Sequence, residues 1–185
     1  MKKILLVEPD YNNKYPPIGL MKISTYHKNK GDYVEFFKGY PPYNAIIEAD
    51  RIYVTSLFTF YYDKTVETIE YIRQFYPDSR IHLGGIAATI MYSRFRERFP
   101  HICIECGQLI SSSKIGYDDN TNIDSLPLDY DILDDIAYKY PAAGNFFAYT
   151  TRGCTNKCKF CAVPILEPDF KETNNLVEQI THARL

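Results

Sequence analysis

Three of the five cysteines in this 185-residue chain lie within eight positions, at Cys154, Cys158 and Cys161. Thiolates are typical ligands of zinc, copper(I) and iron–sulfur clusters. A closed zinc site takes four protein ligands, and the cysteine run of ferredoxins also supplies a fourth. This loop supplies three, and three thiolates on a four-iron cluster leave one iron open to a small molecule. The absence of a fourth cysteine from the loop therefore indicates an iron–sulfur cluster with one open iron more than a closed metal site.

The other candidate metal-binding or redox side chains have more ordinary interpretations. Cys103 and Cys106 form a lone Cys-x2-Cys that could be a redox pair or a metal half-site, although we expect ordinary buried cysteines. His82 lies in a short apolar run, so we expect a core histidine. His27 falls within an expected helix, and we expect it at the surface.

Strand-like and helix-like segments alternate along the first hundred residues. This alternation predicts an α/β fold with a Rossmann-like, doubly wound parallel sheet. Ligands of such sheets bind beyond the carboxyl ends of the strands, here near loops 8–17, 56–62 and 84–87. The expected strands are Lys3–Val7, Tyr33–Phe37, Arg51–Ser56, Ile81–Leu83 and His101–Glu105, and the expected helices are Ile18–Lys30, Asn44–Ala49, Asp63–Tyr76 and Ile86–Phe99.

The pattern changes after about residue 107. Residues 108–145 are polar and rich in turn residues, which predicts a linker with its aspartates, such as Asp129, at the surface. A second unit follows, with an expected strand at Phe146–Thr151, the cysteine loop and an expected helix at Asn174–Ala183. One such unit leaves strand edges and an apolar face uncovered. We therefore expect a fragment, a truncated product or one part of a split protein.

Composition and charge argue against several classes of partner. The formal net charge is −2 and the pI is near 6.1, and no basic stripe indicates a nucleic-acid-binding face. The apolar run Ile4–Val7 is too short for a secretory signal, and no stretch approaches the roughly 20 apolar residues of a membrane span. We expect a cytoplasmic protein without a membrane partner, where reduced, clustered thiols favour metal or redox chemistry over disulfides.

The cysteine motif resembles that of a known superfamily. Gly153-Cys154-x3-Cys158-x-Phe160-Cys161 is similar to the motif of radical S-adenosylmethionine (SAM) proteins. The resemblance implies that the three cysteines hold a [4Fe–4S] cluster, that SAM chelates the open iron and that Phe160 lies beside its adenine. It also implies an electron donor such as flavodoxin or ferredoxin. Reduction then cleaves SAM to a 5′-deoxyadenosyl radical, which acts on an unknown substrate, a small molecule or otherwise.

The residues before the cysteine loop resemble the subfamily with an N-terminal cobalamin (B12)-binding-like domain. Pro16-Pro17-Ile18-Gly19-Leu20 resembles the opening of its first helix. By the same resemblance, Ser56, Leu57, Gly84 and Gly85 are candidate cofactor-binding residues. The implied organisation is a B12-binding-like domain at 1–107, a linker at 108–145 and the start of a TIM-like radical SAM barrel at 146–185.

Two features depart from that subfamily. Domains that ligate cobalt from below carry Asp-x-His-x2-Gly after the first strand, whereas residues 8–15 contain no histidine. Aromatic residues also crowd the loop where a nucleotide tail would lie, namely Phe58, Phe60, Tyr61 and Tyr62. Cobalamin binding therefore stays open. The alternative function is a non-catalytic, cobalamin-type binding module whose cysteines hold a labile iron–sulfur cluster or zinc.

Overall fold

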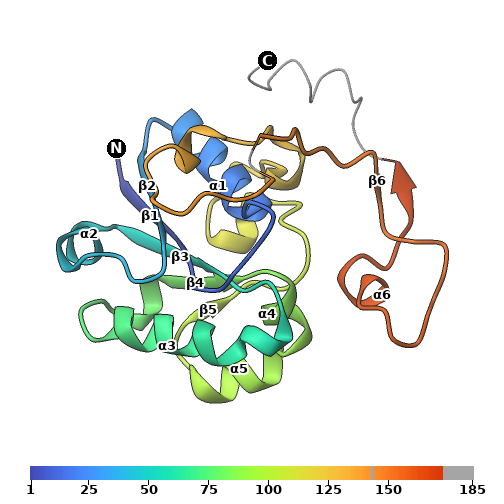
Figure 1. The fold of residues 1–185 in the computed structure, drawn as a ribbon, viewed down its shortest axis with the longest axis horizontal. Coiled ribbons are helices and arrows are strands. Elements are labelled where there is room, and N and C mark those ends of the chain that lie inside the picture. The colour runs from blue at the N-terminus through green and yellow to red at the C-terminus, as the bar shows by residue number, and fades with distance from the viewer. Residues whose placement is uncertain (143, 173–185) are drawn as a thin grey trace.

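Five parallel strands form the centre of the protein, in the order β2-β1-β3-β4-β5 (Figure 1). The structure is a computed structural model and describes residues 1–142 and 144–172. In this strand order the chain leaves β1 and β3 toward opposite faces, and ligands of such sheets bind at the carboxyl ends of that pair. The strands are β1 (Lys3–Glu8), β2 (Tyr33–Lys38), β3 (Arg51–Thr55), β4 (Ile81–Gly84) and β5 (Cys103–Ile104).

Strand β1 is buried on both faces of the sheet. It pairs in parallel with β2 on one side and with β3 on the other. Leu5 and Val7 pack into the core on one face, and Ile4 and Leu6 pack into the core on the other. Side chains alternate between the two faces of a strand, so a strand that is buried on both faces needs consecutive apolar residues. In β1 these are Ile4–Val7.

Helices cover both faces, which confirms the predicted doubly wound fold (Figure 1). Four helices pack on the face of Leu5 and Val7, and α1 packs on the face of Ile4 and Leu6. The expected helix over 86–99 is divided at Met91 (φ −106°, ψ 27°). No helix in the described ranges is both long and apolar enough to cross a membrane. The helices of this domain are α1 (Ile18–Asn29), α2 (Tyr43–Glu48), α3 (Tyr62–Arg73), α4 (Ile86–Ile90) and α5 (Tyr92–Arg98).

An irregular segment completes the cover beside α1. The sequence predicted a linker here, because isolated apolar residues among turn residues show no helical or strand period. In the structure those apolar side chains are buried against Ile4, Leu6 and α1, so the segment is part of the core. It contains three short 3-10 turns, Ser112–Ile115, Ile123–Ser125 and Asp131–Leu133, and its buried side chains include Ile115, Ile123, Ile132, Leu133 and Ile136.

Asp129 ties this segment to α1. The Ser24 hydroxyl donates to its carboxylate at 2.6 Å, and Lys28 forms an ion pair with it at 2.7 Å. The carboxylate is largely covered, so the expectation of a surface residue is wrong for Asp129. It is confirmed for the aspartates at 131, 134 and 135, which are exposed.

The cysteine-bearing residues form a small unit at one side of the sheet (Figure 1). Strand β6 (Thr151–Arg152) pairs antiparallel with β7 (Lys171–Glu172), and the cysteine loop and α6 (Val163–Leu166) lie between them. The strand expected at Phe146–Thr151 is reduced to β6, because residues 146–150 have no neighbouring strand among the described residues to extend the ladder. No closed barrel is present in the described ranges, and the helix expected at Asn174–Ala183 lies outside them.

His27 is buried, which corrects the expectation of a surface position. Its side chain is fully covered, with Nδ1 at 2.8 Å from Asp32 and Nε2 at 3.1 Å from the Tyr53 hydroxyl. The β3 strand below α1 brings Tyr53 to the histidine, a contact that helix periodicity alone does not reveal. Burial lowers the pKa of His27 to about 4, because desolvation of the imidazolium outweighs the attraction of Asp32.

The low pKa of His27 predicts a pH-dependent stability. Below pH 6.5 the unfolded chain binds a proton at this histidine, whereas the folded chain does so only near pH 4. The free energy of unfolding should therefore fall by about 3 kcal/mol as pH drops from 6.5 to 4. Urea unfolding across that range should show the loss in wild type and in the control His101→Gln, whose histidine is exposed. His27→Gln should flatten it, and an unchanged slope would contradict this assignment.

Candidate functional site

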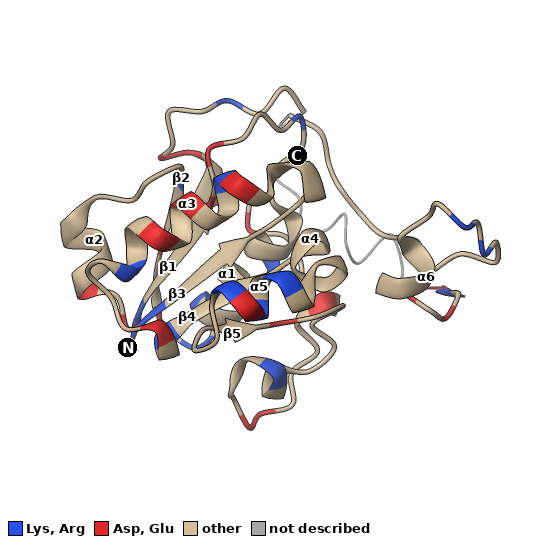
Figure 2. Cartoon of the chain, turned by 90° about the horizontal axis from the view of Figure 1, so that it is seen from below, with Lys and Arg blue, Asp and Glu red and all other residues tan. Residues whose placement is uncertain are grey.

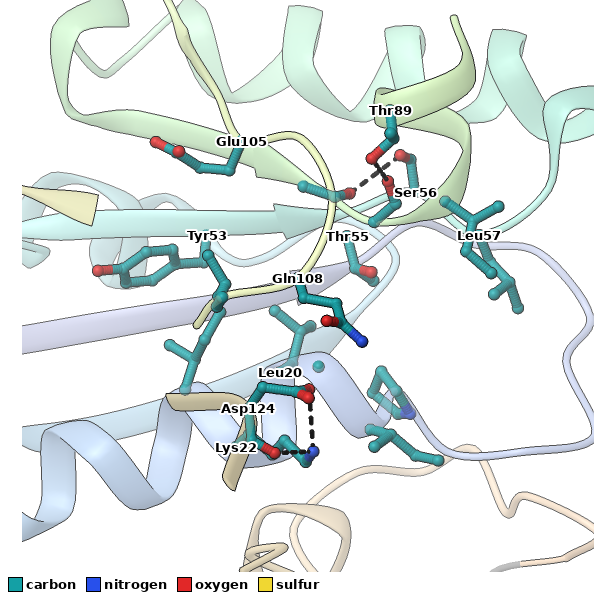
Figure 3. A pocket seen from close by; sticks show the side chains of 18 of the residues that line it. Leu20, Lys22, Tyr53, Thr55, Ser56, Leu57, Thr89, Glu105, Gln108 and Asp124 are labelled. Atoms are coloured by element: carbon teal, nitrogen blue, oxygen red, sulfur yellow. Dashed lines mark hydrogen bonds and ion pairs between the residues drawn. The ribbon is translucent and has the colours of Figure 1, made fainter. Parts of the chain in front are cut away.

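A cavity of about 590 Å³ opens at the carboxyl edge of the sheet (Figure 3). The three loops that follow β1, β3 and β4 contribute to its wall, as the sequence predicted from the strand order. Helix α1, the segment after β5, and the β6–α6 unit complete it. The wall is mainly apolar, with side chains such as Leu20, Ile23, Leu57, Ile86, Leu109 and Leu166.

Ser56, Gly84 and Gly85 line this cavity and also join β3, β4 and α4. The Ser56 hydroxyl donates to the Gly84 carbonyl at 3.0 Å (Figure 3). It accepts from the Ala88 amide at 2.8 Å. Gly85 has φ +104°, and a Cβ there would lie 2.3 Å from the Ser56 carbonyl oxygen. These predicted cofactor-binding residues therefore have a structural role, and their contact with a cofactor stays a prediction.

Aromatic side chains gather in the loop after β3, as expected from the sequence. Tyr61 stacks on Tyr11 from the loop after β1, with ring centroids 4.8 Å apart. Phe58 and Phe60 stack on each other at 5.0 Å and are exposed. Leu57, which starts this loop, faces the cavity (Figure 3). The loop therefore presents an aromatic surface at the mouth of the cavity.

A buried ion pair closes the end of β1. Glu8 and Lys38 lie 3.0 Å apart, with side chains 1% and 4% exposed. The Tyr140 hydroxyl donates to Glu8, and the Lys38 ammonium lies 4.5 Å from the centre of the Tyr138 ring. Burial and the Glu8 charge raise the pKa of Tyr140 far above its usual value, so its hydroxyl stays protonated as a donor. The role of Glu8 was not predicted from the sequence, although a carboxylate at the end of an apolar strand was a signal.

A second charge network docks the cysteine unit beside the cavity. Arg152 in β6 forms ion pairs with Asp124 and with Glu167, the latter at 2.8 Å. Asp124 also pairs with Lys22 of α1 at 3.1 Å (Figure 3). Burial lowers the pKa of Lys22, opposed by Asp124. Because Arg152 is 8% exposed, this is an interior contact between the cysteine unit and the sheet domain.

Arg152 and Glu167 also fix the backbone that leads into the cysteines. The second carboxylate oxygen of Glu167 accepts from the Gly153 amide at 2.7 Å. Gly153 has φ +72°, and a Cβ there would lie 2.3 Å from the Asp169 carbonyl oxygen. Only glycine fits this close approach. The turn into Cys154 therefore packs against the backbone of the residues that lead into β7. Gly153 was predicted from the sequence motif, whereas Arg152 and Glu167 were not.

The three predicted cluster ligands lie on one loop. Cys154 and Cys158 are exposed, Cys161 is half-buried, and all three thiols are free. The Asn156 amide donates to the Cys154 sulfur at 3.4 Å, and the Cys161 amide donates to the Cys158 carbonyl at 3.0 Å. No group of three potential metal ligands is gathered within the described residues. The loop thus offers accessible thiols that have to converge to hold a metal.

Phe160 lies on that same loop, whereas the other remaining candidates lie away from it. Phe160 is 94% exposed, so its ring is free to stack on a ligand. Cys103 and Cys106 are half-buried rather than fully buried, and desolvation raises the pKa of both thiols. His82 is buried and lies 3.4 Å from Glu105, which confirms a core histidine at the cavity wall.

Surface charge is mixed over the molecule. Figure 2 shows acidic and basic residues side by side on α3 and α5, and basic residues on the cysteine-bearing loop. The chain carries 21 Lys and Arg against 23 Asp and Glu, so the two signs of charge are nearly balanced.

Comparison with solved structures supports the fold. The chain is similar to TsrM from Kitasatospora setae, a radical SAM methyltransferase, in a structure with cobalamin and a [4Fe–4S] cluster bound (TM-score 0.64, 17% identity). It is similar to the same enzyme with tryptophan substrate and the SAM analogue aza-SAM bound (TM-score 0.63, 16% identity). A scan of protein-family models and a search of curated proteins gave no match.

The coverage of these alignments is unequal. They include 96% and 97% of this chain but only 46% and 45% of the TsrM chains. The chain therefore spans less than half the length of the solved structures it resembles. At 16–17% identity the likeness shows a shared α/β fold.

The contact between Gly85 and Ser56 predicts a position intolerant of a side chain. Gly85→Ala should lower the free energy of unfolding by about 2 kcal/mol or more, because the new Cβ meets backbone and the positive φ is unfavourable. Gly19→Ala, in α1 with no atom within 4 Å of the added Cβ, should instead raise it by about 0.5 to 1 kcal/mol. Urea unfolding of the two variants checks both signs, and equal effects would contradict the prediction.

The ion pairs of Arg152 with Asp124 and Glu167 predict that these charges hold the cysteine unit against the sheet domain. Arg152→Met leaves Asp124 and Glu167 without their shared cation, so the unit should open more often. Hydrogen exchange in residues 152–161 should accelerate about tenfold or more, while exchange in β1 stays slow. The control is Arg98→Met, because the Arg98–Glu70 pair is exposed and of little energetic value. Equal exchange in the two variants would show that Arg152 does not dock the unit.

Proposed function

We propose that this chain belongs to a radical SAM enzyme and that its cysteine loop holds a [4Fe–4S] cluster. One observation carries the proposal: three free thiols, spaced Cys-x3-Cys-x2-Cys, lie on a loop anchored by buried charges beside the main cavity of the sheet domain. The similarity of the fold to that of a radical SAM methyltransferase supports it. The reaction, the substrate and the activity of the whole protein belong to this proposal.

The donor set fits the cluster. Soft thiolates are the ligands of iron–sulfur clusters, and three of them leave one iron open. When bound, the cluster would supply one electron for reductive cleavage of SAM. Cys154, Cys158 and Cys161 would hold it, and N–H groups such as that of Asn156 would donate to the ligating sulfurs, as they tune such clusters elsewhere.

Other residues of the cysteine unit would position the cluster ligands and contact SAM and the electron donor. Gly153 permits the turn that places Cys154, and Glu167 fixes the Gly153 amide. The exposed ring of Phe160 would stack on the adenine of SAM. An electron donor of the flavodoxin or ferredoxin class would approach the exposed side of the loop, which carries Lys157 and Lys159.

A histidine-ligated cobalamin does not fit the residues at the sheet edge. The loop after β1 has no histidine. His82, the histidine on the cavity wall, already contacts Glu105, and His27 contacts Asp32 and Tyr53. We therefore derive no step through a cobalt–histidine bond.

Reconstitution tests the cluster. After anaerobic addition of iron and sulfide, the wild-type chain should show bound iron and sulfide and, once reduced, an EPR signal that SAM perturbs. Cys154→Ala, Cys158→Ala or Cys161→Ala should remove most of the cluster, because two thiolates hold it poorly. The matched controls Cys103→Ala and Cys106→Ala should retain it. Phe160→Ala should keep the cluster but weaken the effect of SAM.

Two outcomes would count against the proposal. One is stoichiometric zinc without an iron–sulfur signal, which favours the binding-module alternative. The other is a cluster that survives the loss of Cys158.

A further inference from the structure

Among the residues that the structure describes, every charged group on the cavity wall has a partner. A carboxylate on the wall always faces a cation or a histidine, and each wall cation faces a carboxylate, at 3.4 Å or less. An ionic ligand would therefore compete with existing pairs. The wall favours an uncharged ligand, and its pairs are Glu8–Lys38, Lys22–Asp124, Arg152–Asp124, Arg152–Glu167 and His82–Glu105.

The same wall carries three donors without a hydrogen-bond partner. They are the Tyr11 hydroxyl, the Gln108 side-chain amide nitrogen and Nε of Arg152, all shielded from water. Burial and the nearby Glu8 carboxylate raise the pKa of Tyr11, so its hydroxyl stays protonated. This hydroxyl lies near Glu8 and the Leu57 backbone but has no hydrogen bond of good geometry to either. Two other buried side-chain atoms in the described residues share this state, at Glu35 and Tyr117, and neither lines the cavity.

Unpaired buried donors are uncommon in folded proteins, because each one has lost water without gaining a partner. Three of them around one mainly apolar cavity point to acceptors that arrive with a ligand. Gln108 is the clearest case, since Figure 3 shows its amide directed into the space between Thr55 and α1. The terminal torsion of glutamine is broad, so the amide can turn toward a bound acceptor at little cost.

We propose that this cavity binds an uncharged, largely apolar small molecule that presents a carbonyl-type acceptor to the Gln108 amide. The volume of about 590 Å³ lies in the range of small-molecule sites, and apolar walls with a few convergent polar groups are typical of them. Binding in this cavity does not depend on whether the cysteines hold a cluster. The bound molecule would reach the edge of the cysteine unit, because Arg152 and Leu166 line the cavity.

Two matched fluorescent compounds test it on the full chain without metal. One is 6-propionyl-2-(dimethylamino)naphthalene, which has a ketone acceptor, and the other is its 6-propyl analogue, which has none. In fluorescence titrations the ketone should bind about tenfold more tightly, the worth of one hydrogen bond in a dry site. The 6-carboxylate analogue should bind more weakly than the ketone, because each cation on the described part of the wall already pairs with a carboxylate.

Variants assign the difference to Gln108. Gln108→Leu should abolish the preference for the ketone while the propyl analogue still binds, which also shows that the cavity is intact. The control Gln74→Leu alters an exposed glutamine at the end of α3 and should change nothing. Equal affinity of the two neutral compounds in wild type, tightest binding of the carboxylate, or an unchanged preference in Gln108→Leu would overturn the proposal.

A competition experiment distinguishes two kinds of ligand that could supply the carbonyl acceptor. Corrinoids carry amide arms with carbonyl acceptors, and so do free small molecules. Displacement of the ketone by aquocobalamin in wild type, with loss of that displacement in Gln108→Leu, would overturn the proposal in favour of a corrinoid site, because aquocobalamin is a charged corrinoid and not an uncharged, largely apolar molecule. Retained ketone binding in the presence of aquocobalamin would assign the acceptor to a free small molecule.

Discussion

A parallel sheet has to be covered on both faces, and this protein meets that constraint with unequal covers. Four helices pack on one face, whereas the other has α1 and an irregular segment. Helices pack ridges into grooves along their whole length, but an irregular chain contributes apolar side chains only at intervals. The main cavity lies on the irregular side, next to α1. The shape of the candidate site thus follows from how the second face is covered.

The sequence was a good guide wherever structure is local. Apolar runs and helical periods predicted the five strands and most helix boundaries, because each pattern is complete within ten to fifteen residues. It failed where a contact joins distant segments. Ile115 and Ile123 fill the core without a period, and His27 is covered by Tyr53 from another strand. The burial of such residues depends on distant segments, so no local sequence pattern predicts it.

The candidate site shows the same division. The spacing of Cys154, Cys158 and Cys161 is a local pattern, so their grouping on one loop was predictable. The groups that hold that loop were not, since Arg152 pairs with Asp124, 28 residues earlier. Ser56 and Gly85 were predicted to bind a cofactor. The structure shows that they also have a structural role, because β3, β4 and α4 contact one another through them.

The contact between Glu8 and Tyr140 bears on where the folding unit ends. These residues lie 132 positions apart, and the tyrosine hydroxyl satisfies a carboxylate that has almost no access to water. Removal of the chain beyond residue 107 would strip the cover from Ile4 and Leu6 and leave Glu8 short of a donor. The sheet and its irregular cover should consequently melt in one cooperative transition, and a truncated form made for expression should extend at least through Ala142.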